Sequence, residues 1–146
     1  MLRTGLITVA LLMLIGRMAT GADPDKPQEI AGVYAGEGSN GDGSAYRAIV
    51  VIQKYRDAFR VQWIFPSRSA TVGLGILDGD KLAVSYYGPR PGIVLYKIDG
   101  TRLVGQWTLL GAGGMLSSET LTRIPADQVP ENIPLEAPVE GSDLSL

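Results

Sequence analysis

Between residues 29 and 123 the chain alternates short apolar stretches with turn signals. The clearest stretch is Ala58–Phe65, where large apolar side chains occupy every second position and Arg60 and Gln62 stand between them. A period of two residues is typical of a β-strand with one buried face. Segments of this kind predict eight strands, at Glu29–Gly36, Ser44–Gln53, Ala58–Phe65, Ala70–Leu77, Lys81–Tyr87, Gly92–Ile98, Thr101–Leu109 and Met115–Arg123.

The connections between these segments predict antiparallel pairing. Two of them carry an Asp-Gly dipeptide, at Asp78-Gly79 and Asp99-Gly100, which favours tight β-hairpins. The others are also too short to hold a crossover helix. Residues Gln53–Phe59 have a fair helix propensity, but the strand patterns on both sides favour a hairpin with its turn at Tyr55–Asp57. We therefore predict an all-β fold.

The predicted domain covers residues 23–123 and is expected to be an eight-stranded antiparallel up-and-down β-barrel. Closure into a barrel removes the two exposed edges that a meandering sheet would otherwise leave. A barrel of this size is filled by side chains or holds one small ligand. A two-sheet β-sandwich is the alternative, although its connections need longer loops than most of those present.

The N-terminal segment, residues 1–22, has the order of a secretory signal peptide. Arg3 precedes an apolar run at Leu6–Ile15, and small residues then cluster up to Ala22. We place cleavage after Ala22, with Gly21 as the second choice. The protein is therefore expected to be exported, as a secreted or periplasmic protein.

A retained membrane anchor is the competing interpretation of this segment. A membrane-spanning helix needs roughly 20 apolar residues, and Arg17 interrupts the run well before that length. We expect no stable membrane insertion after the signal is removed.

The C-terminal segment, residues 124–146, is acidic and rich in proline. It has four prolines and five acidic residues, and no Lys or Arg follows Arg123. Proline at this density prevents helices and strand ladders from extending, so we predict an extended, largely disordered tail. It is interpreted as a solubilising appendage or, alternatively, as a segment that docks on a basic partner or a cell-wall component.

Composition excludes several classes of function. The chain has neither Cys nor His, which excludes disulfides, thiolate metal sites, cysteine nucleophiles and Ser-His triads. It carries 13 Lys and Arg against 15 Asp and Glu, a formal net charge of -2, so nucleic acid is not an expected partner. We expect no metal site, no cofactor and no catalytic residue.

Two tryptophans are the first candidate ligand-binding residues. Trp63 and Trp107 each lie in a strand whose alternating partners are apolar or glycine, so both are expected to face the barrel interior. Tryptophan at a barrel mouth stacks on a sugar or a flat ligand, but its large apolar area is equally useful in core packing. Pro89-Arg90-Pro91 forms a stiff loop that is expected at the rim of the same mouth.

Glu119 is the candidate polar residue. It is the only acidic residue between Gly100 and Arg123. If Met115, Ser117 and Leu121 share an inward face with it, the carboxyl is buried and needs a partner or stays protonated. The candidate partners are Arg47, Arg60 and Arg102. If Leu116, Ser118 and Thr120 face inward instead, Glu119 is solvated.

Tyr86 and Tyr96 complete the set, on adjacent predicted strands. Tyr86 and Tyr87 are neighbours in the sequence, so one of them must face inward and the other outward. Inward tyrosines give a pocket rigid walls and hydroxyl groups, whereas cross-strand aromatic pairing is a purely structural use.

The ordered elements of the chain resemble a group of exported bacterial β-proteins, many uncharacterised and some labelled fibronectin-binding. The elements that carry the resemblance are Gly32-Val33-Tyr34-Ala35-Gly36, Val61-Gln62-Trp63, Gly73-Leu74-Gly75-Ile76, Leu82-Ala83-Val84-Ser85, Val94-Leu95-Tyr96, Asp99-Gly100, Leu103-Val104-Gly105-Gln106-Trp107-Thr108 and Ser118-Glu119-Thr120-Leu121. The resemblance covers most of residues 29–123 and implies a barrel and, through the fibronectin label, adhesion. A more distant similarity is to avidin-like and lipocalin-like barrels. Tyr34 stands where avidins usually have Trp and no biotin-coordinating set is recognisable, so that similarity implies the fold alone.

The function expected from the sequence is that of an exported, non-catalytic binding protein. Its ligand would be a small apolar or sugar-like molecule at the barrel mouth, or an extracellular macromolecule met by the loops. One alternative is a barrel enzyme that uses Glu119 with a tyrosine or arginine for acid-base chemistry. Another is a structural, envelope-associated or adhesin-like protein.

Overall fold

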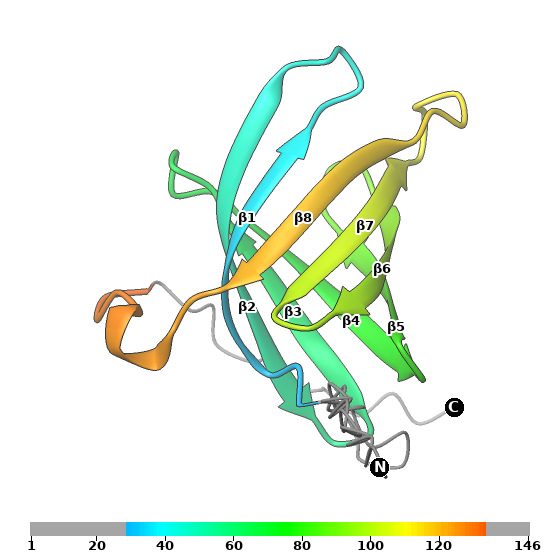
Figure 1. The fold of residues 1–146 in the computed structure, drawn as a ribbon. Helices are drawn as coiled ribbons and strands as arrows, with labels where there is room; N and C mark the ends of the chain where they lie inside the picture. Colours follow the sequence, from blue (N-terminus) through cyan, green and yellow to red (C-terminus); the bar gives the residue numbers. More distant parts are fainter. Residues whose placement is uncertain (1–28, 134–146) are drawn as a thin grey trace, which may run out of the picture.

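The computed structural model describes residues 29–133, which form one closed β-barrel (Figure 1). The strands are β1 (Gly32–Ser39), β2 (Ala45–Tyr55), β3 (Ala58–Ile64), β4 (Ala70–Asp78), β5 (Lys81–Tyr87), β6 (Gly92–Asp99), β7 (Arg102–Leu109) and β8 (Ser117–Arg123). A single turn of 3-10 helix, η1 (Ala126–Gln128), follows the last strand.

The sheet is antiparallel throughout and meanders in sequence order from β1 to β8. It closes because β1 also pairs with β8, for example Gly36 opposite Leu121. Closure leaves no unpaired edge. The predicted up-and-down barrel is confirmed, and the two-sheet sandwich is excluded.

The strand boundaries differ from the sequence prediction mainly at the two strands that close the barrel. β1 begins at Gly32 because the carbonyls of Glu29 and Ala31 accept hydrogen bonds from the Arg123 guanidinium. β8 begins at Ser117 because Met115 belongs to the preceding loop, where its carbonyl accepts a bond from the Thr108 hydroxyl. These backbone groups are satisfied outside the ladder, so both strands begin later than predicted, and β1 continues to Ser39 where the prediction ended it at Gly36.

The segment with helix propensity is a hairpin, as predicted. β2 ends at Tyr55 and β3 begins at Ala58, and the two strands stay in register up to that pair. Arg56 has φ 53° in the turn between them, a left-handed conformation of the kind that tight hairpin turns require.

One end of the barrel, on the side of the β2–β3, β4–β5 and β6–β7 turns, is filled by side chains. Ile30, Tyr34 and Leu103 are among the least exposed residues there. Arg123 covers Tyr34, with its guanidinium carbon 5.1 Å from the ring centroid. We call this the closed end. The opposite end, on the side of the β1–β2 and β7–β8 loops (top of Figure 1), is called the open end.

Two sequence predictions fall wholly or partly outside the described residues. The signal peptide at residues 1–22 lies outside them, as does the tail from residue 134 onward. The described start of the tail contains η1, a short helical turn that the prediction of an extended tail did not include. Within residues 29–133 no helix is long and apolar enough to cross a membrane.

Candidate functional site

Glu119 lies on the inner face of β8 near the middle of the barrel. Ser117 and Leu121 share this face, and Glu119 retains only 2 % of its accessible surface. The inward alternative of the sequence analysis is therefore confirmed for these residues, whereas Met115 lies in the exposed loop before the strand.

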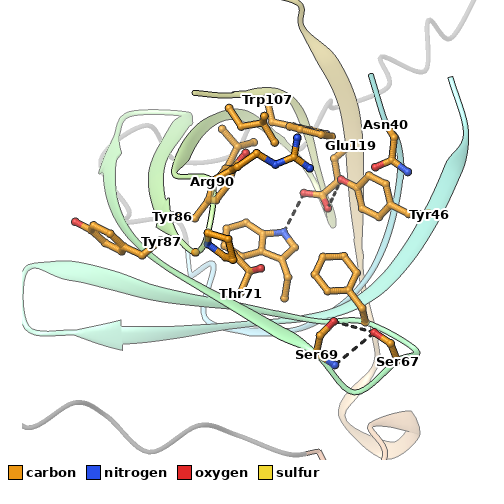
Figure 2. Close-up of a pocket in the computed structure, with 16 residues that line it drawn as sticks. Asn40, Tyr46, Ser67, Ser69, Thr71, Tyr86, Tyr87, Arg90, Trp107 and Glu119 are labelled. Carbon is orange, nitrogen blue, oxygen red and sulfur yellow. Dashed lines mark hydrogen bonds between the residues drawn. The ribbon is translucent and has the colours of Figure 1, made fainter. Parts of the chain in front are cut away.

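Three neutral donors bind the Glu119 carboxyl. The Tyr46 hydroxyl donates to Oε1 at 2.9 Å. The Trp63 indole N–H donates to Oε2 at 3.2 Å, and the Tyr96 hydroxyl donates to the same oxygen. Figure 2 shows the carboxyl between Tyr46 and Trp63, at the base of a hollow lined by aromatic rings.

None of the three arginines offered by the sequence as partners of a buried Glu119 pairs with it, so of the two alternatives the arginine partner is excluded. Arg47 and Arg102 point outward and form exposed ion pairs with Glu37 and Asp99, respectively. Arg60 also lies on the outer face, where it donates to Gln62. Each of these arginines is next to an inward-facing residue of its own strand. Because side chains alternate between the two faces of a strand, each arginine points away from the interior.

The register explains how two tyrosines reach one carboxyl. Glu119 pairs with Gly38 on β1 and with Gly105 on β7. Each glycine pairs on its other side with a tyrosine, Gly38 with Tyr46 and Gly105 with Tyr96. The five residues form one row across β2, β1, β8, β7 and β6.

Glycine is required in that row because the tyrosine rings lie directly over it. A Cβ atom on Gly38 would be 2.5 Å from Tyr46 Cζ, and one on Gly105 would be 2.4 Å from Tyr96 Cδ1. These distances are well below ordinary van der Waals contact. The missing side chains let both rings lie flat across the row and point their hydroxyls at Glu119.

Burial dominates the electrostatics of this cluster. Burial raises the pKa of Glu119, and the hydrogen bonds from Tyr96, Trp63 and Tyr46 oppose the shift. Burial also raises the pKa of the Tyr46, Tyr86 and Tyr96 hydroxyls, and the nearby Glu119 charge adds to it. The three tyrosines therefore stay protonated, and Glu119 is the group that titrates.

Above Glu119 the barrel encloses a cavity of about 550 Å³ that opens at the mouth. This volume lies within the range of roughly 300–1,000 Å³ typical of small-molecule sites. The lining is mainly aromatic and comprises Tyr46, Trp63, Phe65, Tyr86, Tyr87 and Trp107, with Val94, Leu109, Thr71, Asn40, Ser67, Ser69, Gly88, Pro89, Arg90 and Glu119.

The aromatic side chains of the cavity pack edge to face. Tyr46 contacts Phe65 and Trp107 with centroid separations of 6.0 and 6.2 Å, and Trp63 contacts Tyr86 at 5.8 Å. Such T-shaped pairs are the favoured arrangement of aromatic rings. These contacts connect the aromatic side chains that line the cavity to one another.

The Trp107 indole N–H is buried and has no hydrogen-bond acceptor among the described residues. It lies close enough to Tyr46 to lower the pKa of that hydroxyl, but without hydrogen-bond geometry. A buried donor without a partner costs about 1–3 kcal/mol. Trp63, by contrast, is fully satisfied by Glu119.

The structure brings all five sequence candidates to one region. Trp63, Trp107, Tyr86 and Glu119 line the cavity. Tyr96 lies one layer deeper, is fully buried, and touches the site through its bond to Glu119.

Tyr86 and Tyr87 divide as the alternation requires. The Tyr86 hydroxyl on β5 donates to the Thr108 carbonyl on β7 at 3.0 Å. Tyr87, by contrast, is 66 % exposed at the mouth. Arg90 and Pro89 also line the mouth, as expected for the rim loop.

Tyr46 and Phe65 are site residues that sequence reasoning did not select. The segment around Tyr46 contains four consecutive β-branched residues, Ile49–Ile52, so its pattern does not show which side chains face inward. Phe65 lies on the inward face of its predicted strand, two positions after Trp63. Its position on the same face as Trp63 is the signal that could have identified it as a site residue.

The described part of the chain contains no group of three or more Asp, Glu, His or Cys residues that could hold a metal ion. Comparison with protein-family models and with curated proteins found no match for this chain. The site therefore has to be interpreted from its own geometry.

Proposed function

We propose that this protein is an exported, non-catalytic binding protein that holds a small molecule in the open end of its barrel. The observation that carries the proposal is the cavity of about 550 Å³, with rigid aromatic walls and a single buried carboxyl at its base. Apolar walls with a few convergent polar groups are the usual composition of a small-molecule site.

The two ends of the cavity suggest how such a molecule is held. Trp63, Tyr86 and Trp107 offer apolar and ring surface to its body. Glu119 offers an acceptor, and the Trp107 N–H, which has no acceptor in the described part of the chain, offers a donor. A ligand that satisfies the Trp107 N–H removes the cost of leaving that donor buried without a partner.

A second candidate function, acid catalysis, is favoured by one observation. Burial raises the pKa of Glu119, and the carboxyl faces a cavity that reaches the solvent. A carboxylic acid that stays protonated nearer neutral pH is suited to proton transfer. Here Tyr46 and Tyr96 would hold the carboxyl in place.

Native mass spectrometry of the protein exported by its own host tests the binding proposal. We expect a co-purified small molecule, and we expect Thr71→Trp to abolish it because Thr71 lines the cavity. Leu74→Trp is the matched control, since Leu74 lies on the same strand but faces outward and is 45 % exposed.

Three outcomes separate the candidates. A molecule retained by Leu74→Trp and lost from Thr71→Trp supports binding in the cavity. A molecule whose mass changes when it is incubated with fresh protein supports catalysis. An empty wild-type barrel, with a macromolecule held equally by both variants, would overturn the cavity proposal in favour of the loops.

A further inference from the structure

We propose that the small molecule is an organic cation, whose positively charged group lies against the Glu119 carboxylate and whose apolar body lies among the aromatic side chains. This inference rests on the proposed function and specifies its ligand class. It follows from three independent features of the cavity: its unpaired charge, a free acceptor position and its rings.

The first feature is a carboxyl without a counter-charge. All three groups bonded to Glu119 are neutral donors, from Tyr46, Trp63 and Tyr96. No ion pair to Glu119 occurs within residues 29–133, where both salt bridges lie on the outer surface. Because a buried charge without a counter-charge is costly, a cation that enters the cavity is stabilised by the site and stabilises it in return.

The second feature is an open acceptor position on Oε1. A carboxylate accepts about four hydrogen bonds, and Oε2 already accepts two, from Trp63 and Tyr96, while Oε1 accepts one from Tyr46. Since Glu119 also lines the cavity, we infer that a ligand donor takes the acceptor position on Oε1 that the donors within residues 29–133 leave open. A protonated amine supplies both that donor and the missing charge.

The third feature is the aromatic lining. Tyr46, Trp63, Phe65, Tyr86 and Trp107 surround the space above the carboxyl. Aromatic rings attract a cation through their quadrupole, by about 0.5–2 kcal/mol depending on how far the cation is desolvated. The same rings bind an apolar ligand body, so they suit an organic cation better than a hydrated inorganic one.

Among the described residues that line the cavity, Arg90 is the one with a positive charge, and it opposes this assignment at the mouth. Its side chain extends from the β5–β6 loop over the cavity (Figure 2), and the residue is exposed. Solvent and salt screen an exposed charge far more than a buried one. The buried carboxylate therefore determines the sign of the ligand, and Arg90 weakens the binding of a cation only slightly.

A matched series of probes tests the inference: phenethylamine, phenethyl alcohol and phenylacetate share one ring and differ in charge. Tryptophan fluorescence titrations of the wild-type protein at neutral pH are expected to show about tenfold tighter binding of the amine than of the alcohol. Phenylacetate is expected to bind more weakly than either.

Two single variants are expected to change the amine affinity in opposite directions. Glu119→Gln is expected to reduce amine affinity about tenfold, to that of the alcohol, without changing alcohol affinity. Arg90→Gln is expected to raise amine affinity about twofold at low salt. Glu37→Gln, an exposed carboxylate on β1, is the control and leaves all three affinities unchanged.

The pH dependence gives a second measurement on the wild-type protein alone. Amine affinity is expected to increase as pH rises through the raised pKa of Glu119, because the carboxylate form is the one that binds. The tyrosines that face the ligand, Tyr46 and Tyr86, keep their protons over this range because burial raises the pKa of both hydroxyls. Arg90 is the other charged side chain that lines the cavity. Alcohol affinity is expected to stay flat or fall.

The outcomes distinguish this inference from the proposed function. Tighter binding of the alcohol or of phenylacetate than of the amine overturns the cation assignment while leaving a small-molecule site. Equal amine affinity in the wild type and in a folded Glu119→Gln variant overturns the cation assignment as well. The melting temperature of the variant shows that it is folded. Absence of binding by every probe, together with an empty barrel in native mass spectrometry, overturns both.

Discussion

The two ends of the barrel differ in how they satisfy an inward-facing ionisable side chain of β8. Arg123 at the closed end and Glu119 at the open end lie four residues apart on the same inner face of one strand. The Arg123 guanidinium donates to the carbonyls of Ala31 and Glu29 and to the Tyr34 hydroxyl, at 2.9, 2.7 and 2.8 Å. All three hydrogen-bond acceptors of Arg123 are therefore groups of the protein itself.

The open end is incomplete by comparison. Within residues 29–133, Glu119 has three neutral donors but no counter-charge, and the neighbouring Trp107 N–H has no acceptor. A cavity lies directly above both groups. If stability alone determined this end of the barrel, these polar groups would be expected to have partners. Instead they lack partners at a place that a ligand can reach, and this contrast supports a binding role for the open end.

Replacing Gly105 by alanine should have the largest effect, because it disrupts the row that holds Glu119. The new Cβ would lie 2.4 Å from Tyr96 Cδ1 and 3.0 Å from the Leu95 carbonyl oxygen. Overpacking of this kind is expected to lower the free energy of unfolding by about 3 kcal/mol. Urea denaturation measures it, with Gly41→Ala as the control, whose Cβ would find its nearest neighbour at 3.8 Å. Equal stability of the two variants would show that Tyr96 does not lie over Gly105.

Arg123→Met should have the next largest effect and tests the closed end. It removes three hydrogen bonds to a charged donor and uncovers the Tyr34 ring, which we expect to cost about 2 kcal/mol. Arg102→Met, which loses only an exposed ion pair with Asp99, is expected to cost less than about 0.5 kcal/mol. Comparable losses in the two variants would contradict the difference drawn between a partly buried arginine with three hydrogen bonds and an exposed arginine with one ion pair.

Glu119→Gln should have the smallest effect on stability and the opposite sign. The pKa of Glu119 is raised by burial, so the folded state holds a proton more tightly than the unfolded state does. The stability that this proton provides is complete at acid pH and is lost as pH rises through the folded-state pKa. Wild-type melting temperature should therefore fall relative to the variant as pH rises through the pKa of Glu119, and above that pKa the variant should be the more stable of the two. A difference that does not vary with pH would contradict a raised pKa.

Much of the fold could be predicted from the sequence because local patterns specify it. Alternation in Ala58–Phe65 assigns Trp63 to the interior, and the Asp99-Gly100 turn sets the β6–β7 register. That register places Tyr96 opposite Gly105, a pairing that counting outward from the turn would have given. The same alternation turns Arg60 away from Glu119, so this candidate partner could have been rejected from the sequence.

The rest depends on contacts between distant parts of the chain. Glu119 lies beside Gly38 only because β8 pairs with β1, and no turn connects these two strands to fix their register. Tyr46 enters the site through that same closure, since it reaches Glu119 across Gly38. Whether the interior is filled or hollow depends on how side chains from all eight strands fit together, which alternation does not specify.

The most direct test of the account is the pair of tryptophan indole N–H signals in a ¹⁵N-labelled sample, since the chain has only two tryptophans. The Trp63 signal should follow the titration of Glu119, to which it is bonded. Phenethylamine should then shift both signals in the wild-type protein, and Trp63→Phe and Trp107→Phe assign them. If the amine moves signals of the loops while both indole signals stay fixed and Trp63 shows no titration, the carboxyl is not the centre of a binding site and the account is wrong.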